Sequence, residues 1–340
     1  MNLDEEPHDL ETRVAAFAHT FEQLATAIGT VVVGQRATVE EVLVALFARG
    51  HVLIEGVPGL GKTLLVRALG RAISAQFKRI QFTPDLMPSD VTGGNVFDTK
   101  ENQFRFVPGP VFTQILLADE INRAPAKTQA ALLEAMQERQ VTVDGRSMAL
   151  PVPFLCLATQ NPIESQGTYA LPEAQLDRFF FKLHIGHPQL EDEKAILRLH
   201  LNGLDPADFG RVGLHPVVDV PQLAALQATV DQITVADSVV DYAVRLVHAS
   251  RTHRQVLLGA SPRASVALIG AGRVRAAAEG RTFVVPDDVA DHAAAVLRHR
   301  LSLHPDADLE GTTPDEVIAE LLREVPVPRT AAVAGSAAIA

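Results

Sequence analysis

The spacing of hydrophobic residues divides the chain into two parts with different secondary structure. Up to about residue 190, short apolar runs alternate with segments whose apolar residues recur at helical spacing. The apolar runs lie at 51–55, 79–82, 115–118, 154–159 and 179–184. Strands that alternate with helices predict an α/β domain with a mainly parallel sheet and helices on both faces.

From residue 191 onward the pattern is helical throughout. Five segments carry apolar residues at helical spacing, and several begin close to a proline or an aspartate, which favour helix starts. They read EDEKAILRLHL, VPQLAALQATVDQI, VVDYAVRLVHASR, PRASVALIGAGRVRAAAE and PDDVADHAAAVLRHRL. We therefore predict an α/β domain over residues 1–190, a smaller all-helical domain over 191–325, and a flexible tail of small residues over 326–340.

Two interruptions of the first part predict β-hairpins. The segment 92–112 places strand-like pieces on either side of a polar turn, with Phe97 before the turn and Phe104 and Phe106 after it. Further on, QVTVDGRSMAL alternates around an Asp-Gly dipeptide, which favours a tight hairpin turn. The hairpins either decorate the sheet or project toward a partner, and the pattern alone leaves both alternatives open.

The stretch HVLIEGVPGLGKTLLVRALGRAI joins an apolar run to a glycine-rich turn and then a helical pattern. Its centre fills G-x-x-x-x-G-K-[ST], in which backbone N–H groups converge on phosphate oxygens at a helix N-terminus. A glycine-rich turn with an incidental lysine is the alternative, but the strand-to-helix setting favours a nucleotide site. The Thr63 hydroxyl would ligate magnesium. The predicted phosphate-binding residues are Gly56, Pro58, Gly59, Gly61, Lys62 and Thr63.

A second apolar run, QILLA, ends in Asp119 and Glu120. Ligands of open α/β sheets bind beyond the carboxyl ends of the strands, so we expect these two acids near the phosphates. Asp119 suits a magnesium shell, and Glu120 suits a general base or a water-orienting group. Acidic pairs often merely end a strand, but a phosphate loop earlier in the chain favours the catalytic interpretation.

Composition supports a globular protein and weighs against several other classes. The chain has 340 residues and is 47% apolar, which is enough for two domains with a substantial core. The single cysteine, Cys156, excludes a disulfide within the chain, and we expect it to be a small core residue in a reducing compartment. The net charge of −11 disfavours a dedicated nucleic-acid binder.

Targeting and metal-binding signals are weak. The N-terminal MNLDEEPHDLE lacks a basic-then-apolar leader, and no run approaches the ~18 apolar residues of a membrane span, so we expect a cytoplasmic protein without membrane insertion. The 12 histidines form no zinc-binding motif. We expect His292, His299 and His304 at solvated helix positions.

Four motifs together closely resemble the MoxR family of AAA+ ATPases. They read GVPGLGKT, LLADEINRAPAKTQAALLEAMQE, ATQNPIESQGTYALPEAQLDRF and GASPRA, and the resemblance covers the chain from Val31 to about Leu301. It implies an AAA+ P-loop αβα domain with a helical lid and a ring-shaped homo-oligomer, usually a hexamer. It also implies a chaperone-like role in maturing or activating partner complexes, commonly with proteins that bear von Willebrand factor A domains.

The resemblance assigns roles to residues outside the phosphate loop. Asn161, in ATQNP, matches the polar residue that orients the attacking water together with Glu120, and an amide suits this role because it both donates and accepts hydrogen bonds. The segment that resembles the adenine contact consists of Val33, Gly34 and Gln35.

The resemblance also assigns two arginines to the transferred phosphoryl group. Arg178, in LDRF, resembles the arginine finger that enters the site of a neighbouring subunit, and Arg263, in SPRA, resembles the lid arginine that contacts the phosphates of its own subunit. Planar guanidinium donors suit the charge that develops there. A single arginine most often forms a surface salt bridge, but both lie within family motifs. Arg123, directly after the acidic pair, is a rival for the subunit contact.

These inferences predict an ATP-driven remodelling machine that uses ATP and Mg²⁺ and acts on protein clients. A nucleic-acid translocase is one alternative, because hairpins near the pore of a ring also serve helicases. A nucleotide-gated adaptor with little turnover is another. The acidity of the chain and the resemblance favour a protein client. A short hairpin cannot bury three aromatic rings, so we expect some of Phe97, Phe104 and Phe106 to contact a ring neighbour or the client.

Overall fold

A five-stranded parallel sheet forms the centre of the molecule. The computed structural model describes residues 7–161, 168–201 and 205–328. The strand order is β2-β5-β8-β1-β9, and every neighbouring pair in this sheet is parallel. The predicted α/β fold is therefore confirmed. The strands are β1 (Val52–Glu55), β2 (Phe77–Gln81), β5 (Ile115–Asp119), β8 (Leu155–Gln160) and β9 (Phe181–His184).

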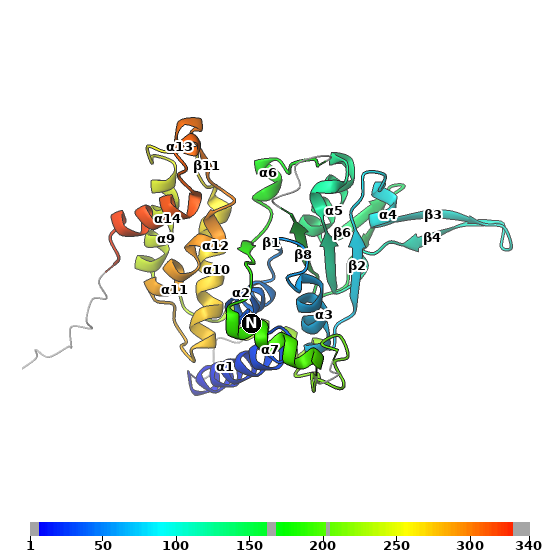
Figure 1. The fold of residues 1–340 in the computed structure, drawn as a ribbon, viewed down its shortest axis with the longest axis horizontal. Coiled ribbons are helices and arrows are strands. Elements are labelled where there is room, and N and C mark those ends of the chain that lie inside the picture. Colours follow the sequence, from blue (N-terminus) through cyan, green and yellow to red (C-terminus); the bar gives the residue numbers. More distant parts are fainter. Residues whose placement is uncertain (1–6, 162–167, 202–204, 329–340) are drawn as a thin grey trace, which may run out of the picture.

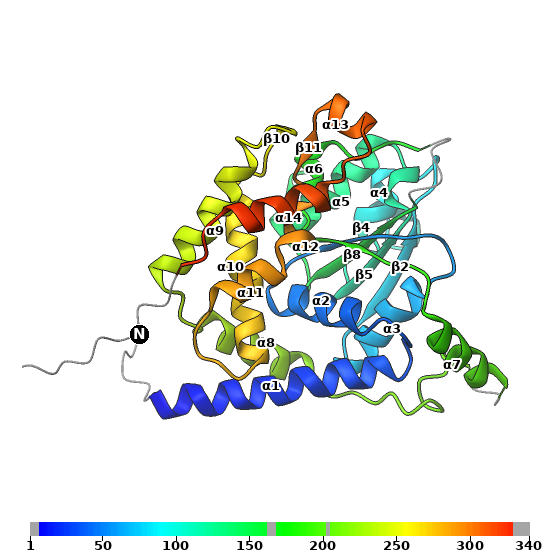
Figure 2. The ribbon, with the colours of Figure 1, turned by 60° about the vertical axis from the view of Figure 1, so that its left-hand side comes forward.

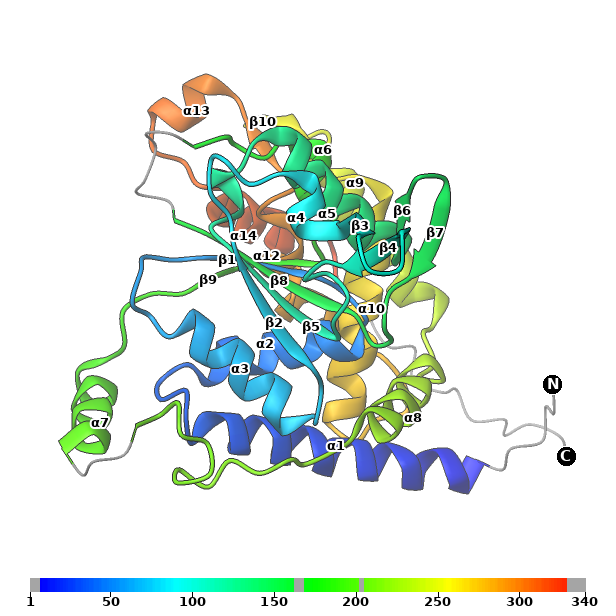
Figure 3. The same ribbon diagram turned by 90° about the vertical axis from the view of Figure 1, so that its right-hand side faces the viewer.

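Helices cover both faces of the sheet, which gives the αβα arrangement (Figure 3). On β1, Val52 and Ile54 contribute to a core shared with the helices of one face, while Leu53 points to the core on the other face. Side chains alternate along a strand, so a wholly apolar strand is buried on both sides. One face carries α1 (Pro7–Gly29), α2 (Arg36–Phe47) and α3 (Lys62–Ala72), and the other carries α4 (Pro88–Thr92) and α5 (Ala126–Glu138).

A group of helices from the last third of the chain lies beside the sandwich (Figures 1 and 2). The apolar residues of this group join those of α1, α2 and α3 in one continuous core, so the group is docked firmly. A short two-stranded sheet, β10 (Val256–Leu258) with β11 (Ser302–Leu303), belongs to it. The helices are α8 (Val220–Asp231), α9 (Asp237–Ser250), α10 (Pro262–Ala278), α11 (Pro286–Asp291), α12 (Ala293–Leu297), α13 (Pro305–Leu309) and α14 (Pro314–Glu324).

Helix α7 (Leu190–Leu201) lies apart from this group, on the far side of the sandwich (Figures 2 and 3). Its residues Ile196 and Leu199 border the same cavity as Leu64 of α3. The first helix of the predicted 191–325 domain therefore lies at the mouth of the phosphate loop. Of the predicted tail, residues 329–340 lie outside the described residues.

The first predicted hairpin forms and projects from the sandwich (Figure 1). It consists of β3 (Gly93–Asp98) and β4 (Gln103–Pro108), which pair antiparallel. Phe97 and Phe104 face each other across the strands with ring centroids 5.3 Å apart, and they are 46% and 72% exposed. Phe106 is half-buried and packs against Phe112 instead, with centroids 5.6 Å apart. Two of the three rings are thus available to a partner.

The second predicted hairpin consists of β6 (Gln140–Val143) and β7 (Arg146–Ala149). Both turn residues have positive φ, 49° at Asp144 and 78° at Gly145, as a tight hairpin turn of this kind requires. The side-chain amide of Asn95 donates to the Asp144 carboxylate at 2.6 Å. This hydrogen bond joins the two hairpins to each other.

Several histidines are buried, and the prediction of solvated positions for His292 and His299 is wrong. Each is 5% exposed. The ring of His292 stacks on Phe181 with centroids 5.7 Å apart, and His299 hydrogen-bonds the carbonyl oxygen of Phe179 at 3.0 Å. Both contacts are with residues of the segment around β9, so the docking of the lid against that segment buries the two rings. His304 lies at the N-terminus of α13.

Cys156 is fully buried on β8, as predicted for a small core residue. Burial raises the pKa of its thiol, which keeps the group neutral and unreactive. Among the helices that the structure describes, none has the length and apolar character needed to cross a membrane.

Candidate functional site

The phosphate loop connects the end of β1 to the start of α3. Gly59 and Gly61 have φ of 86° and 78°, in the left-handed region that favours glycine. A Cβ built on either residue would meet no atom within 4 Å, so the space in front of the loop is open. The loop therefore has the backbone shape and the free volume that a phosphate group needs at a helix N-terminus.

Lys62 and Thr63 are the first residues of α3, and both are half-buried. The Lys62 ammonium donates to the carbonyl oxygen of Gly56 at 2.5 Å, so the side chain folds back across the loop. Burial lowers the pKa of Lys62, while the nearby charges of Asp119 and Glu120 act in the opposite direction. The loop lysine and the acidic pair predicted from sequence thus share one electrostatic environment.

Asp119 ends β5, Glu120 directly follows it, and Thr159 of the neighbouring strand β8 contacts both. The Thr159 hydroxyl donates to Asp119 Oδ1 at 2.5 Å and accepts the backbone N–H of Glu120 at 2.9 Å. Glu120 has φ of 56°, an unusual conformation for glutamate that the surrounding contacts must hold. Thr159 therefore fixes the positions of both acids.

Strand β2 supplies polar partners for the same acids. Its side chains Arg79 and Gln81 are two residues apart and project from one face of the strand. Arg79 forms an ion pair with Asp119 at 2.6 Å, and the amide of Gln81 donates to Glu120 Oε2 at 2.7 Å. Both carboxylates therefore have polar partners on β2.

Arg123 belongs to the same end of the sheet. It closes the short 3₁₀ helix η1 (Ile121–Arg123), and its guanidinium lies 3.3 Å from Glu120 Oε2. Asn161 directly follows β8, the strand between β5 and β1, and it is buried. The strand order therefore gathers Gly56, Glu120 and Asn161 at one edge. The motif residues 162–167 that follow Asn161 lie outside the described residues.

The last residue of β1 forms ion pairs with the neighbouring edge strand, β9. Glu55, the last residue before the loop, lies 2.5 Å from the ammonium of Lys182 and 3.2 Å from the ring of His184, both on β9. Burial opposes ionisation of Glu55, but hydrogen bonds from His184 and Lys182 prevail and lower its pKa to about 2. Glu55 is thus ionised at neutral pH and anchors the strand that carries the loop.

The predicted adenine segment lies against the phosphate loop. The side-chain amide of Gln35 donates to the carbonyl oxygen of Leu60 at 2.9 Å. Val33 and Gln35 line a mainly apolar cavity of about 180 Å³, which Ile196 and Leu199 of α7 close from the other side. The backbone of Gly34 approaches α7 closely, since a Cβ there would lie 2.6 Å from the Asp192 carboxylate. The cavity suits a flat apolar base.

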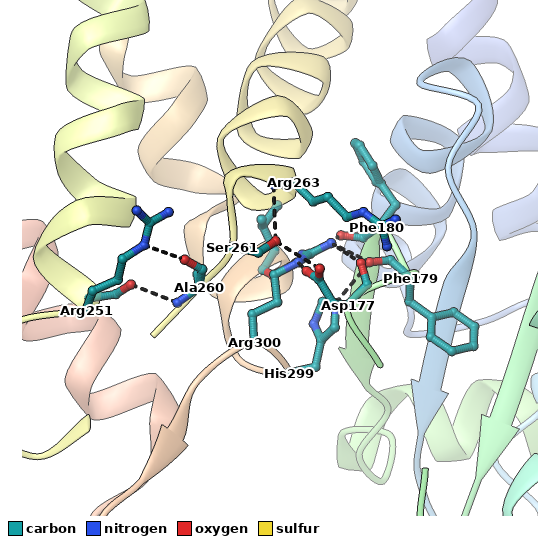
Figure 4. A network of polar contacts seen from close by, with 11 residues as sticks. Asp177, Phe179, Phe180, Arg251, Ala260, Ser261, Arg263, His299 and Arg300 are labelled. Atoms are coloured by element: carbon teal, nitrogen blue, oxygen red, sulfur yellow. Dashed lines mark hydrogen bonds and ion pairs between the residues drawn. The ribbon is translucent and has the colours of Figure 1, made fainter. Parts of the chain in front are cut away.

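Arg178 and Arg263 lie together at the opposite end of the sheet from the loop. Both line a cavity of about 540 Å³ that also borders His51, the residue before β1. Arg178 follows α6 (Glu173–Leu176), and Arg263 is in the first turn of α10. β1 separates this cavity from the loop by four residues, or about 13 Å at 3.3 Å per residue. Figure 4 shows Arg263 and the polar contacts of Asp177, the residue before Arg178.

Comparison with known proteins agrees with this geometry. Residues 51–181 match the family model described as "ATPase family associated with various cellular activities (AAA)", and residues 248–321 match "AAA lid domain". The chain is 44% identical over 329 residues to Chaperone MoxR1 of Mycobacterium tuberculosis (strain ATCC 25618 / H37Rv), which covers 94% of this chain and 85% of the relative.

The chain belongs to the MoxR family of AAA+ ATPases. Other similar proteins include the uncharacterized protein YeaC of Bacillus subtilis (strain 168), 48% identical over 88% of this chain and 92% of that protein. A crystal structure of a candidate ATPase from Cytophaga hutchinsonii superposes with a TM-score of 0.87 at 36% identity, covering 95% of this chain and 99% of that one. The predicted family, helical lid and ATPase activity are confirmed.

For a MoxR-family ATPase, the residues present fit a magnesium–nucleotide complex. The loop leaves room for phosphates, and the hydroxyl of Thr63 with the carboxylate of Asp119 supplies the hard oxygen ligands that Mg²⁺ prefers. Arg79 occupies one oxygen of Asp119 and must yield or share it when a cation approaches.

Sequence reasoning missed several members of the MoxR-type site. Thr159 lies within the quoted motif ATQNP but was not singled out. Arg79 and Gln81 had a weak signal, since two polar residues alternate with apolar ones on a strand expected to be buried. The position of α7 beside the Val33–Gln35 cavity had no signal in the sequence, because it depends on where the chain turns after β9.

Proposed function

We propose that this chain is a Mg²⁺-ATP-dependent ring ATPase of the MoxR type that remodels or activates protein partners. The observation that carries the proposal is the separation of the site into two parts. The phosphate loop and both acids lie at one end of the sheet, while Arg178 and Arg263 line one cavity at the other end. Arg178 and Arg263 therefore lie away from the phosphate loop of their own subunit, and a neighbour in a ring would bring them to it.

Within one subunit, the loop N–H groups and Lys62 would hold the phosphates, and the Val33–Gln35 segment with α7 would hold the base. Magnesium, when bound, neutralises charge on the phosphate oxygens. Glu120 and Asn161 would orient the water that attacks, because both lie at the strand ends beside the loop. Glu120 reaches that role only after it exchanges its bond with Gln81 for one with the water.

Between subunits, both arginines would act on the nucleotide of the neighbour. The sequence suggested that Arg263 contacts the phosphates of its own subunit, but the shared cavity with Arg178 favours a role across the interface for both. Such a contact joins two different faces and repeats head to tail, which closes into a ring. The family resemblance implies six subunits.

The interface arginine is tested by mixing two inactive variants. Arg178→Ala removes the finger, and Glu120→Gln removes the water-orienting carboxylate, so each homogeneous ring should hydrolyse ATP poorly, by roughly 10³-fold for the arginine. In mixed rings some interfaces pair an intact glutamate with an intact arginine, and activity should return in proportion to those interfaces. Mixed rings that form, as shown by native mass spectrometry, without any recovery would contradict the proposal.

The client is proposed to bind at the projecting hairpin. Phe97 and Phe104 are exposed, meet edge to face and are held away from the sandwich, as expected of aromatic anchors for a protein surface. The resemblance suggests partners with von Willebrand factor A domains. Replacing both rings by serine should leave basal ATP turnover within about twofold, because the hairpin is remote from the loop, and should weaken partner binding or partner-stimulated turnover.

A matched control for the hairpin is Leu309→Ser, which removes an exposed apolar side chain on α13 that is 87% exposed. Partner binding should be lost only in the hairpin variant. Tight binding of single-stranded nucleic acid near physiological salt, abolished by Lys100→Ala with Arg105→Ala, would instead indicate a translocase.

A further inference from the structure

Three segments that are distant in sequence meet at the carboxylate of Asp177, the residue before Arg178 (Figure 4). Oδ1 of Asp177 accepts from Arg300 Nε at 2.8 Å, and Oδ2 accepts from the Ser261 hydroxyl at 2.9 Å. Arg300 lies between α12 and β11, and Ser261 begins α10. One side chain thus links the segment 177–180 around Arg178, here named the finger loop, to two parts of the helical lid.

Arg300 also donates hydrogen bonds to the backbone of the finger loop. Its Nη2 donates to the carbonyl oxygen of Phe179 at 2.6 Å, and its Nη1 donates to that of Phe180 at 3.3 Å. The side chain is only 3% exposed, and a buried guanidinium is tolerated only when its charge and its donors are satisfied. The loop therefore cannot shift relative to the lid without leaving a buried charge uncompensated.

Ser261 fixes the backbone position of Arg263. Its hydroxyl oxygen accepts the backbone N–H of Arg263 at 3.2 Å, which caps α10, while the same hydroxyl donates to Asp177. The preceding residue is fixed as well, because Arg251 Nε donates to the carbonyl oxygen of Ala260 at 2.8 Å. The start of α10, and with it Arg263, is thereby locked to the finger loop.

The side chains of Arg178 and Arg263 make few polar contacts of their own. Neither the Arg178 nor the Arg263 guanidinium forms a hydrogen bond or an ion pair with the residues described between 7 and 328. Their direction therefore depends on the backbone that carries them, and both backbones are held by Asp177 and its partners. A group that must meet a phosphoryl oxygen in another subunit needs such a rigid support, since misplacement by about 1 Å is costly to catalysis.

We propose that Asp177, Arg300 and Ser261 are positioning residues that present Arg178 and Arg263 to the neighbouring subunit as one rigid unit. The inference rests on the proposed function of these arginines across the interface and adds the residues that hold them. None of the three is expected to touch the nucleotide. A defect in any of them should appear in the active site of the next subunit and not in the subunit that carries the change.

The test uses Ser261→Ala as the main variant, because Arg300→Ala would leave the Asp177 charge buried and risks unfolding. Ser261→Ala should lower kcat roughly 10-fold, the order expected for a lost hydrogen bond to a charged group, with the KM for ATP unchanged within about twofold. Ser261→Thr, which keeps the hydroxyl and the cap, should restore kcat. Arg300→Lys keeps the positive charge but cannot donate to both carbonyl oxygens of the finger loop. It should also lower kcat with KM unchanged.

A cap-matched control separates positioning from loss of lid stability. Thr313 caps α14 through the same kind of bond, to the backbone N–H of Glu316 at 3.3 Å, but its hydroxyl donates to the Glu316 carboxylate and not to the finger loop. Thr313→Ala should cost similar stability, typically ~1 kcal/mol for a helix cap, yet leave kcat unchanged. An equal loss of kcat in Thr313→Ala and Ser261→Ala would overturn the inference.

Mixed rings show whether Ser261→Ala impairs the active site of its own subunit or that of the neighbour. Ser261→Ala subunits have an intact loop and glutamate, so Glu120→Gln neighbours should supply properly held arginines and raise activity above that of Ser261→Ala rings alone. Recovery for Arg178→Ala with Glu120→Gln, but none for Ser261→Ala with Glu120→Gln, would overturn this inference and leave the proposed function standing. Recovery in neither mixture would overturn both.

Discussion

The two ends of the parallel sheet are built in different ways. At the phosphate end, the loop before α3 and the acids at the end of β5 come from short motifs at the carboxyl ends of β1 and β5, which flank β8 in the sheet. At the arginine end, Asp177, Ser261 and Arg300 come from three distant segments and depend on how the lid docks. Short sequence motifs bring the residues of the phosphate end together, whereas the packing of the lid brings those of the arginine end together.

The ion pairs at the two ends also differ in burial. Arg79 is 47% exposed where it meets Asp119, and pairs of this kind contribute about 0–1 kcal/mol and exchange readily. Arg300 is buried where it meets Asp177, and breaking such a pair costs about 3–5 kcal/mol. The phosphate end is thus suited to rearrange when a nucleotide binds, and the arginine end is suited to stay rigid.

The largest expected effect separates binding from turnover at the phosphate end. Lys62→Ala should weaken ATP binding roughly 10- to 100-fold, because the phosphates lose a charged hydrogen-bond donor, and turnover should fall with it. Glu120→Gln should keep the affinity within about twofold but lower turnover roughly 10²- to 10⁴-fold, because only the attacking water loses its partner. Calorimetry and phosphate release measure the two quantities. Equal losses of affinity in both variants would contradict the assigned roles.

The next effect concerns Arg263 at the arginine end. Arg263→Ala should lower turnover roughly 10²-fold, the order found when one donor to a developing charge is removed. Because Arg263 shares a cavity with Arg178 and not with the loop, mixing Arg263→Ala with Glu120→Gln subunits should restore part of the activity. Phosphate release from defined mixtures is the measurement. Without recovery, Arg263 acts within its own subunit, and the lid must move to bring it there.

A stability effect at the arginine end comes from His51. Its Nδ1 accepts the backbone N–H of Cys156 at 3.1 Å and its Nε2 donates to the carbonyl oxygen of Met136 at 3.0 Å, so the ring is held neutral. Burial lowers the pKa of His51 from 6.5 to about 4. Above pH 6.5 neither state binds a proton, and between pH 6.5 and 4 only the unfolded chain does. The contribution of His51, roughly 3 kcal/mol, is therefore lost as the pH falls through this range.

Denaturant titration at several pH values measures this effect. The difference in unfolding free energy between the wild type and His51→Gln should shrink as the pH falls from 7 to 4.5, since the glutamine variant has no proton to take up at this position. His299, also buried, is present in both proteins and cancels. A difference that stays constant across this range would show that His51 is not the group that titrates.

Much of the fold, and the gathering of the loop and the acidic pair at one edge of the sheet, followed from sequence, for physical reasons that differ between residues. Val52, Leu53 and Ile54 predict a strand buried on both faces, and such a strand needs only local pattern to be recognised. Lys62 and Asp119 are likewise predictable, because strand order alone brings their motifs to one edge. The role of Asp177 could not be predicted from sequence, since it depends on a hydrogen bond with Ser261, which lies 84 residues away.

The histidines show the same limit. A helix rich in alanine gives no strong periodic signal, so nothing in the pattern around His299 tells which side faces the core. Its burial follows from the contact with the carbonyl oxygen of Phe179, which only the docked lid creates. His299 and Asp177, which join the two parts of the molecule, are thus residues whose place the local pattern does not predict.

The smallest expected effect tests whether the phosphate end is poised to rearrange. Gln81 accepts from Arg79 Nη2 at 2.6 Å and donates to Glu120 at 2.7 Å, so it holds the carboxylate in a position from which it must depart to orient water. Gln81→Leu removes the donor at similar length. Basal turnover should rise severalfold with unchanged nucleotide affinity, because Glu120 no longer gives up a charge-assisted hydrogen bond on the way to the active arrangement. Gln103→Leu removes the exposed Gln103–Glu101 hydrogen bond on the hairpin and serves as the matched control, with no change expected in either quantity. If Gln81→Leu instead lowers turnover, Gln81 supports the active position of Glu120, and the phosphate end is as rigid as the arginine end.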